Sequence, residues 1–101
     1  MSVYAVALIT IHDRAAYTKY EEGFSEIFRR YAGEILSVEE SPRVIEGEWP
    51  YTRTVLLRFP SEAGFREWYD SPAYQAIAQH RFAGSSVQLV LISGRDAKPP
   101  R

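Results

Sequence analysis

The segment Val44–Gln75, with the sequence VIEGEWPYTRTVLLRFPSEAGFREWYDSPAYQ, carries most of the information about the fold. It opens with a Glu-Gly-x-Trp turn and continues into Thr52–Phe59, which has the composition of a strand and is apolar on both faces. Pro60-Ser61 ends that strand, and Ser61 can cap a helix that extends to about Asp70. A strand that is apolar on both faces needs cover on both, which is the first indication of how the sheet is assembled.

The pair Ser71-Pro72 predicts a break in the helical region that follows. Proline has no N–H and clashes with the preceding turn when it lies inside a helix, but it fits the first turn of a new helix. We therefore expect a second helix on a new axis, with Ser71 as its N-cap, that runs to about Phe82.

Upstream of this segment, Val3–Ile11 is rich in β-branched residues and apolar on both faces, so it predicts another strand of the same kind. Asp13 is a suitable N-cap for a helix. Aromatic and aliphatic residues then recur at helical spacing from Tyr17 to Tyr31. Gly33 is expected to end this helix in a left-handed backbone conformation.

The remaining segments complete a four-stranded sheet. Glu34–Glu40 and Arg43–Glu46 predict one edge strand that is interrupted at Ser41-Pro42, and Val87–Ser93 predicts the last strand. The order β-α-β-β-α-β is that of the ferredoxin-like plait, an α+β fold with a four-stranded antiparallel sheet.

Two helical regions can cover only one face of such a sheet, and the central strands are apolar on the other face as well. A second copy of the chain, packed sheet to sheet, is the simplest cover. We therefore predict a homodimer, a dimeric α+β barrel. Each chain would contribute one ferredoxin-like domain at residues 1–96 and a flexible C-terminal tail at residues 97–101.

Composition narrows the class of protein. The 101 residues carry a net charge of −1 with no basic patch, so we do not expect nucleic-acid binding. There is no cysteine for a disulfide or a thiolate site. Neither a signal-peptide pattern nor an apolar run long enough to cross a bilayer is visible. We expect a cytoplasmic protein with no membrane partner, no metal site and no cofactor.

Several short motifs occur together over about Val3–Gly94. They are Tyr17 and Tyr20, Tyr31-x-Gly33-Glu34, Val44–Trp49, Phe59-Pro60-Ser61, Trp68-Tyr69-x-Ser71-Pro72-x-Tyr74-Gln75 and Arg81. As a set they resemble domain-of-unknown-function family 1330, within the dimeric α+β barrel superfamily. Many members have two adjacent glycines where this chain has Ala32-Gly33. The resemblance implies a dimer and a cleft between sheet and helices, and it brings no established activity.

Glu46 and Arg53 are the first candidates for chemistry. They flank the connection between two strands, so a hairpin would place them opposite one another. A carboxylate held ionised by a guanidinium inside a pocket could take up a proton or orient a polar substrate. The alternative is a cross-strand ion pair that only fixes the register of the strands.

His80 and Arg81 are neighbours on the predicted last helix. His80 could act as an acid or base. If the protein bound haem, which is a more distant possibility, His80 would be the axial ligand. A lone histidine on a helix, however, is most often at a surface or interface. Arg81 could bind a carboxylate through two hydrogen bonds. Its alternative role is to pair with a nearby acid such as Glu34 or one in the region of Glu46.

Three aromatic residues complete the predicted site. Tyr20 and Tyr74 point inward from their helices, and converging phenols would give an aromatic pocket with polar groups. Trp49 could form a wall of that pocket, anchor its own loop or reach into the dimer interface. The catalytic candidates are Glu46, Arg53 and His80, and the binding candidates are Tyr20, Trp49, Tyr74 and Arg81.

Two classes of function fit these residues. The first is a small-molecule-binding protein, which in its stronger form is a cofactor-free enzyme acting on a small organic acid or aromatic compound; it rests on analogy within the superfamily. The second is a non-catalytic dimeric scaffold or accessory protein in which the same residues are structural. A cavity with convergent polar groups would favour the first class, and a filled interior would favour the second.

Overall fold

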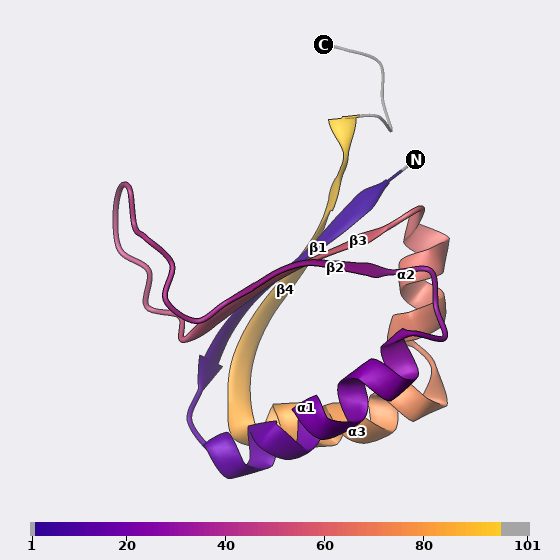
Figure 1. The fold of residues 1–101 in the computed structure, drawn as a ribbon, viewed down its shortest axis with the longest axis horizontal. Helices are drawn as coiled ribbons and strands as arrows, with labels where there is room; N and C mark the ends of the chain where they lie inside the picture. Colours follow the sequence, from indigo (N-terminus) through magenta and orange to yellow (C-terminus); the bar gives the residue numbers. More distant parts are fainter. Residues whose placement is uncertain (1, 96–101) are drawn as a thin grey trace.

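The computed structural model describes residues 2–95, so the tail predicted at residues 97–101 lies outside the described residues. The elements follow the predicted order (Figure 1). They are β1 (Val3–Ile11), α1 (Arg14–Phe28), β2 (Glu34–Glu39), β3 (Arg53–Phe59), α2 (Glu62–Tyr69), α3 (Pro72–Gly84) and β4 (Ser85–Ser93). Within residues 2–95 no helix is long and apolar enough to cross a membrane.

The four strands form one antiparallel sheet in the order β2-β3-β1-β4. The two strands with apolar residues on both faces, β1 and β3, are therefore central. In the register of the sheet, Ala5 stands opposite Leu57 of β3 and Leu91 of β4, and all three belong to the core on the helix side. The fold is the α+β ferredoxin-like plait that the sequence predicts.

Side-chain caps set the start of each helix. The side chains of Asp13, Ser61 and Ser71 each accept a hydrogen bond from the amide three residues later. The hydroxyl of Ser71 also donates to the carbonyl oxygen of Trp68 at 2.8 Å, which ties the end of α2 to the start of α3. The break predicted at Ser71-Pro72 is confirmed.

Gly33 serves a different purpose from the one predicted. In the described part of the chain only Gly47 has a positive φ, so Gly33 is not in the left-handed conformation. A β-carbon at position 33 would lie 2.5 Å from the Phe28 ring and 2.6 Å from the Phe59 ring. Glycine is required there because two aromatic rings pack directly on its backbone.

Residues 41–52, here called the arm, leave the sheet between β2 and β3 and project away from it (Figure 1). The prediction of a strand at Arg43–Glu46 is wrong, because that segment lies in the arm and pairs with no strand. Pairing of β2 with β3 stops at Glu39 and Thr54. A segment of strand-like composition forms a strand only where a neighbour completes its backbone hydrogen bonds.

All the helices lie on one side of the sheet (Figure 1). On that side Phe28, Phe59 and Trp68 form an aromatic cluster with ring centres 5.3–5.8 Å apart. The other side, here called the open face, is covered by none of the helices within residues 2–95. Its apolar side chains are Tyr4, Val6, Leu8, Leu56, Val90 and Ile92. Val90 and Ile92 are 55% and 51% exposed.

Candidate functional site

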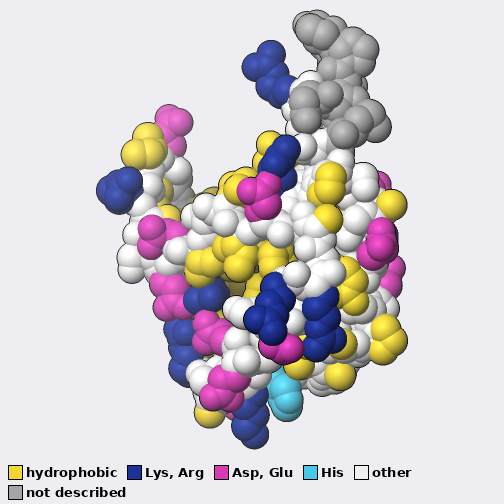
Figure 2. Space-filling view, turned by 45° about the vertical axis from the view of Figure 1, so that its right-hand side comes forward, with side chains coloured by type: hydrophobic (Ala, Val, Ile, Leu, Met, Phe, Trp, Pro, Cys, Tyr) yellow, Lys and Arg dark blue, Asp and Glu magenta, His cyan; other side chains and the backbone are white. Residues whose placement is uncertain are grey.

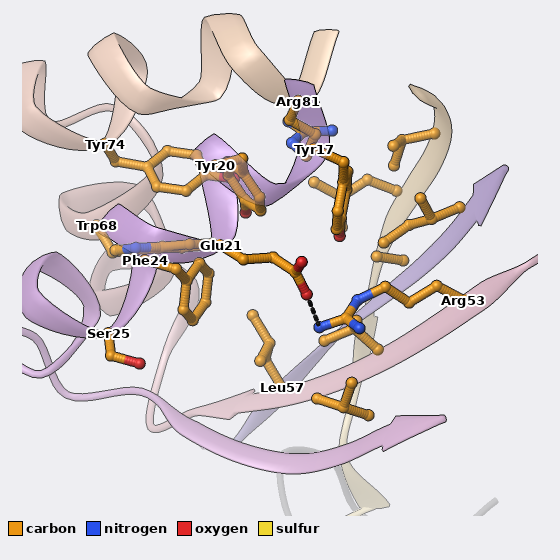
Figure 3. Close-up of a pocket in the computed structure, with 16 residues that line it drawn as sticks. Tyr17, Tyr20, Glu21, Phe24, Ser25, Arg53, Leu57, Trp68, Tyr74 and Arg81 are labelled. Atoms are coloured by element: carbon orange, nitrogen blue, oxygen red, sulfur yellow. Dashed lines mark hydrogen bonds and ion pairs between the residues drawn. The ribbon is translucent and has the colours of Figure 1, made fainter. Parts of the chain in front are cut away.

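A cavity of about 230 Å³ lies between the sheet and the helices (Figure 3). Strand side chains form an apolar floor: Ala7, Ile9, Val55, Leu57, Val87 and Leu89. Helix side chains form the opposite wall: Tyr17, Tyr20, Phe24, Trp68, Tyr74 and Arg81. Glu21, Ser25 and Val38 also line the cavity, so it opens between α1 and the edge strand β2. Figure 2 shows a hollow in the surface with hydrophobic side chains at its bottom and basic and acidic side chains around it.

Tyr20 of α1 and Tyr74 of α3 meet at the wall of this pocket. Their hydroxyl oxygens are 2.8 Å apart, and the two residues are 7% and 2% exposed. One hydroxyl donates to the other, which leaves one O–H of the pair free to donate to a ligand. Burial raises the pKa of Tyr20 well above its ordinary value, and burial also raises the pKa of Tyr74 against the opposing effect of Arg81. Both phenols are therefore neutral hydrogen-bond donors at physiological pH.

Arg53 enters the pocket from β3 and pairs with two carboxylates. Its guanidinium lies 3.2 Å from Glu21 of α1, the contact drawn in Figure 3, and 2.7 Å from Glu40. Glu40 is in turn 3.2 Å from Arg14. Hydrogen bonds from Arg14 and Arg53 lower the pKa of Glu40. Two arginines thus meet two carboxylates, and the cluster as a whole is neutral.

Arg81, in the last turn of α3, has no such partner. It is 6% exposed, and its Cζ lies 5.8 Å from the ring centre of Tyr20 and 4.9 Å from that of Phe82. Within residues 2–95 it forms no ion pair with a carboxylate. Of the acids suggested as its partner, Glu34 pairs with Arg58 at 2.6 Å and Glu46 lies exposed in the arm. The wall of the pocket therefore carries a buried guanidinium whose charge no side chain of the described residues neutralises.

Three buried side-chain N–H groups have no hydrogen-bond partner among the described residues. They are the Nε groups of Arg53 and Arg81 and the Nε1 group of Trp68, and all three residues line the pocket. Buried polar groups in folded proteins are nearly always hydrogen-bonded. The unpartnered groups here are all donors, so an acceptor that reached them would complete their hydrogen bonds.

The predicted ion pair between Glu46 and Arg53 is wrong. Arg53 faces the helix side of the sheet, where Glu21 and Glu40 take its contacts, whereas Glu46 lies exposed in the arm. The sequence interpretation missed Glu21. Its signal was present, since Glu21 follows the buried Tyr17 by one helical turn and so shares the same face of α1.

His80 and Trp49 also lie outside the pocket lining. His80 is exposed on α3, because consecutive helix residues point in directions about 100° apart and Arg81 is the one that turns inward. Trp49 donates from Nε1 to the hydroxyl of Thr54 at 3.0 Å, and Thr54 lies opposite Leu8 on the open face. Trp49 is thus on the other side of the sheet from the pocket.

The predicted site residues that the structure does bring together are Tyr20, Arg53, Tyr74 and Arg81. Two guanidinium groups and two phenols therefore share one apolar cavity. No group of histidine, aspartate and glutamate side chains that could hold a metal ion is present among residues 2–95.

Solved structures share this fold at low sequence identity. The RPA0582 protein of unknown function from Rhodopseudomonas palustris gives a TM-score of 0.79 at 19% identity, over 97% of this chain and 84% of that chain. SnoaB, a cofactor-independent oxygenase from Streptomyces nogalater, gives a TM-score of 0.63 at 19% identity, over 93% of each chain. A dimeric ferredoxin-like protein of unknown function from Thermobifida fusca gives 0.65 at 16% identity, over 92% of this chain and 91% of that chain.

At these identities the likeness establishes the fold, and structural neighbours with this fold are dimeric. No curated protein matches the sequence significantly. The family profile of DUF1330, described as a domain of unknown function, matches residues 2–95. The chain therefore belongs to the DUF1330 family.

Proposed function

We propose that this protein is a homodimer that binds a compact, mainly apolar organic molecule in the pocket of each chain. The observation that carries the proposal is the cavity itself, which is lined by aliphatic and aromatic side chains and by three residues that each carry an unpartnered N–H group. A non-catalytic scaffold would have no need to keep such a space open, since a filled core is more stable.

The size of the cavity limits the ligand. Pockets for drug-sized molecules have volumes of roughly 300–1,000 Å³, and this one is about 230 Å³. It therefore suits a molecule with one ring or a short branched chain. The apolar floor would bind the body of such a molecule, and the donors of the helix wall would orient its polar end.

The proposal can be tested with a panel of small organic acids, amides and aromatic compounds. Each compound is added to the protein, and a rise in the unfolding temperature is measured. A ligand that binds only the folded chain raises its stability. The variant Ala7→Leu fills the floor of the pocket, whereas Ala63→Leu makes the same change at an exposed position of α2. We expect Ala7→Leu to fold and to lose the response, and Ala63→Leu to respond like the parent protein. A response that survives Ala7→Leu would place the ligand elsewhere.

The dimer is supported by the open face. Its apolar side chains would form a large exposed patch on a monomer, and structural neighbours of this fold are dimeric. The arm adds apolar surface, with Ile45 89% and Trp49 42% exposed. Because Trp49 bonds to Thr54 on the open face, we include the arm in the proposed interface.

A cofactor-free enzyme is the second candidate, and Glu21 is the observation that favours it. A carboxylate that lines the pocket and is held by Arg53 could take a proton from a bound molecule. SnoaB, which shares the fold, is a cofactor-independent oxygenase. Chromatography of a compound incubated with the protein would detect conversion. We expect Glu21→Gln to retain binding and to abolish conversion; conversion at the parent rate would exclude Glu21 as the base.

A further inference from the structure

The charges in the pocket do not balance. Arg53 is compensated by Glu21 and Glu40, but Arg81 pairs with no carboxylate of the described residues, and its guanidinium lies near the rings of Tyr20 and Phe82. Arginine remains protonated at any physiological pH. A buried and unpaired charge is costly, and folded proteins normally pair such groups.

The end of α3 supplies only part of the compensation. Arg81 lies in the last turn of that helix, where the carboxyl end carries roughly half a negative charge. Contacts with the faces of aromatic rings also favour the cation. Neither supplies the planar pair of oxygen acceptors that a guanidinium binds best.

The hydrogen-bonding groups point to the same kind of ligand. The unpartnered buried groups are N–H donors, and the Tyr20–Tyr74 pair has a further O–H to donate. Water could accept these hydrogen bonds, but it would not neutralise Arg81. A carboxylate does both, because its oxygens only accept hydrogen bonds and carry the opposite charge.

We propose that the pocket selects an organic monoanion, a compact apolar carboxylate, whose oxygens bind Arg81 and the free hydroxyl of the Tyr20–Tyr74 pair. The inference rests on the proposed binding function and names the class of ligand. The aliphatic floor formed by Ala7, Val55 and Leu89 would contact the hydrocarbon part of the acid. Arg81 is the residue that distinguishes the acid from a neutral molecule of the same shape.

Matched pairs of ligands separate the charge from the shape. Benzoate and benzamide have nearly the same shape, and so do isovalerate and isovaleramide, but only the acids are charged at neutral pH. Titration calorimetry at fixed ionic strength should show tighter binding of at least one acid than of its amide, by about 10- to 100-fold. Equal binding of acid and amide in both pairs would overturn the inference and leave the proposed function standing. Binding of neither would count against both.

Variants of Arg81 test the residue. Arg81→Met keeps the length of the side chain and removes the charge, so we expect it to abolish the preference for the acid while the affinity for the amide changes less than about threefold. The control Arg30→Met makes the same change at an exposed arginine and should keep the preference. Arg81→Lys keeps the charge but lacks the planar guanidinium that binds two oxygens, so we expect a reduced preference for the acid. If Arg81→Met does not fold, Arg81→Lys provides the test. A preference for the acid that persists undiminished in the folded variants would overturn the assignment to Arg81. Loss of stability alone, with the preference unchanged, would show that Arg81 is structural.

Discussion

The hydroxyls of Tyr20 and Tyr74 connect α1 and α3 through one buried hydrogen bond. Tyr20→Phe removes it and leaves the Tyr74 hydroxyl without this partner, so we expect the free energy of unfolding to fall by about 1–2 kcal/mol. Tyr31→Phe is the control, since Tyr31 is half-buried and its hydroxyl makes no hydrogen bond with the described residues. That change should cost less than about 0.5 kcal/mol. Urea denaturation measures both variants, and equal costs would show that the bond contributes nothing to stability.

The buried phenols should also lower the stability of the folded protein at alkaline pH. Burial raises the pKa of Tyr17, Tyr20 and Tyr74 above the ordinary value of 10.0. In the unfolded chain these groups ionise near pH 10, while in the folded chain they stay neutral, so loss of protons favours unfolding. Their contribution to stability is complete below pH 10 and is lost as the pH rises toward their folded-state pKa values. We expect the urea midpoint to fall steeply above about pH 10, together with a rise in tyrosinate absorbance. Complete ionisation of the tyrosines in a protein that stays folded would contradict this.

At the scale of single residues, the sequence predicts what depends on near neighbours. The caps at Asp13 and Ser71 follow from residues within one turn, and the inward direction of Tyr20 follows from helical spacing. The partner of Arg53 does not follow in the same way. It depends on which face of the sheet Arg53 occupies and on which residue of α1 crosses above it, and both are set by packing between distant segments.

The same substitution should have opposite effects on stability at two helical glycines, Gly64 and Gly84, because their surroundings are packed differently. A β-carbon at Gly84 would lie 2.8 Å from the carbonyl oxygen of Asp13 and 2.8 Å from the amide nitrogen of Tyr17. A β-carbon at Gly64 would be no closer than 3.5 Å to its nearest neighbour. We expect Gly64→Ala to stabilise the protein by up to about 1 kcal/mol and Gly84→Ala to destabilise it by more than about 2 kcal/mol. Thermal unfolding of both variants tests this, and the idea fails if the two changes have the same sign.

At the scale of elements, the order of strands and helices and the break at Ser71-Pro72 could be predicted, because each has a local signal. The arm could not. Arg43–Glu46 has the composition of a strand, but whether it pairs depends on the length of β3, which begins only at Arg53. Gly33 shows the same limit, since the rings of Phe28 and Phe59 that exclude a side chain there come from two different elements.

For the whole molecule, Leu56 and Leu57 provide a matched test of the dimer. Leu56 lies on the open face, whereas Leu57 is 5% exposed on the helix side. We expect Leu56→Glu to give a folded monomer near 11.6 kDa by light scattering, because a charge on the open face cannot be buried against a second copy. Leu57→Glu should prevent folding altogether, which circular dichroism would show. A Leu56→Glu protein that remains a dimer would mean that the open face is not the interface.

The sequence predicts that Tyr20, Arg53, Tyr74 and Arg81 share a site, and the structure brings these four residues to one cavity. It does not predict that Trp49 belongs to the opposite side. Trp49 is only four residues from Arg53 in the chain, yet the arm carries it past the edge of the sheet to the open face. Nearness in sequence is a poor guide to a shared site where the chain leaves the sheet and returns.

The position of the pocket on the helix side of the sheet has a consequence for binding by the proposed dimer. Two chains joined through their open faces would place the pockets on opposite outer sides, separated by two sheets about 10 Å apart. The side chains that line the cavity lie on the helix side of the sheet, away from the proposed interface. Each dimer should therefore take up two ligand molecules independently, with a hyperbolic isotherm and a Hill coefficient of about 1. The Leu56→Glu monomer should bind with the same affinity as the dimer.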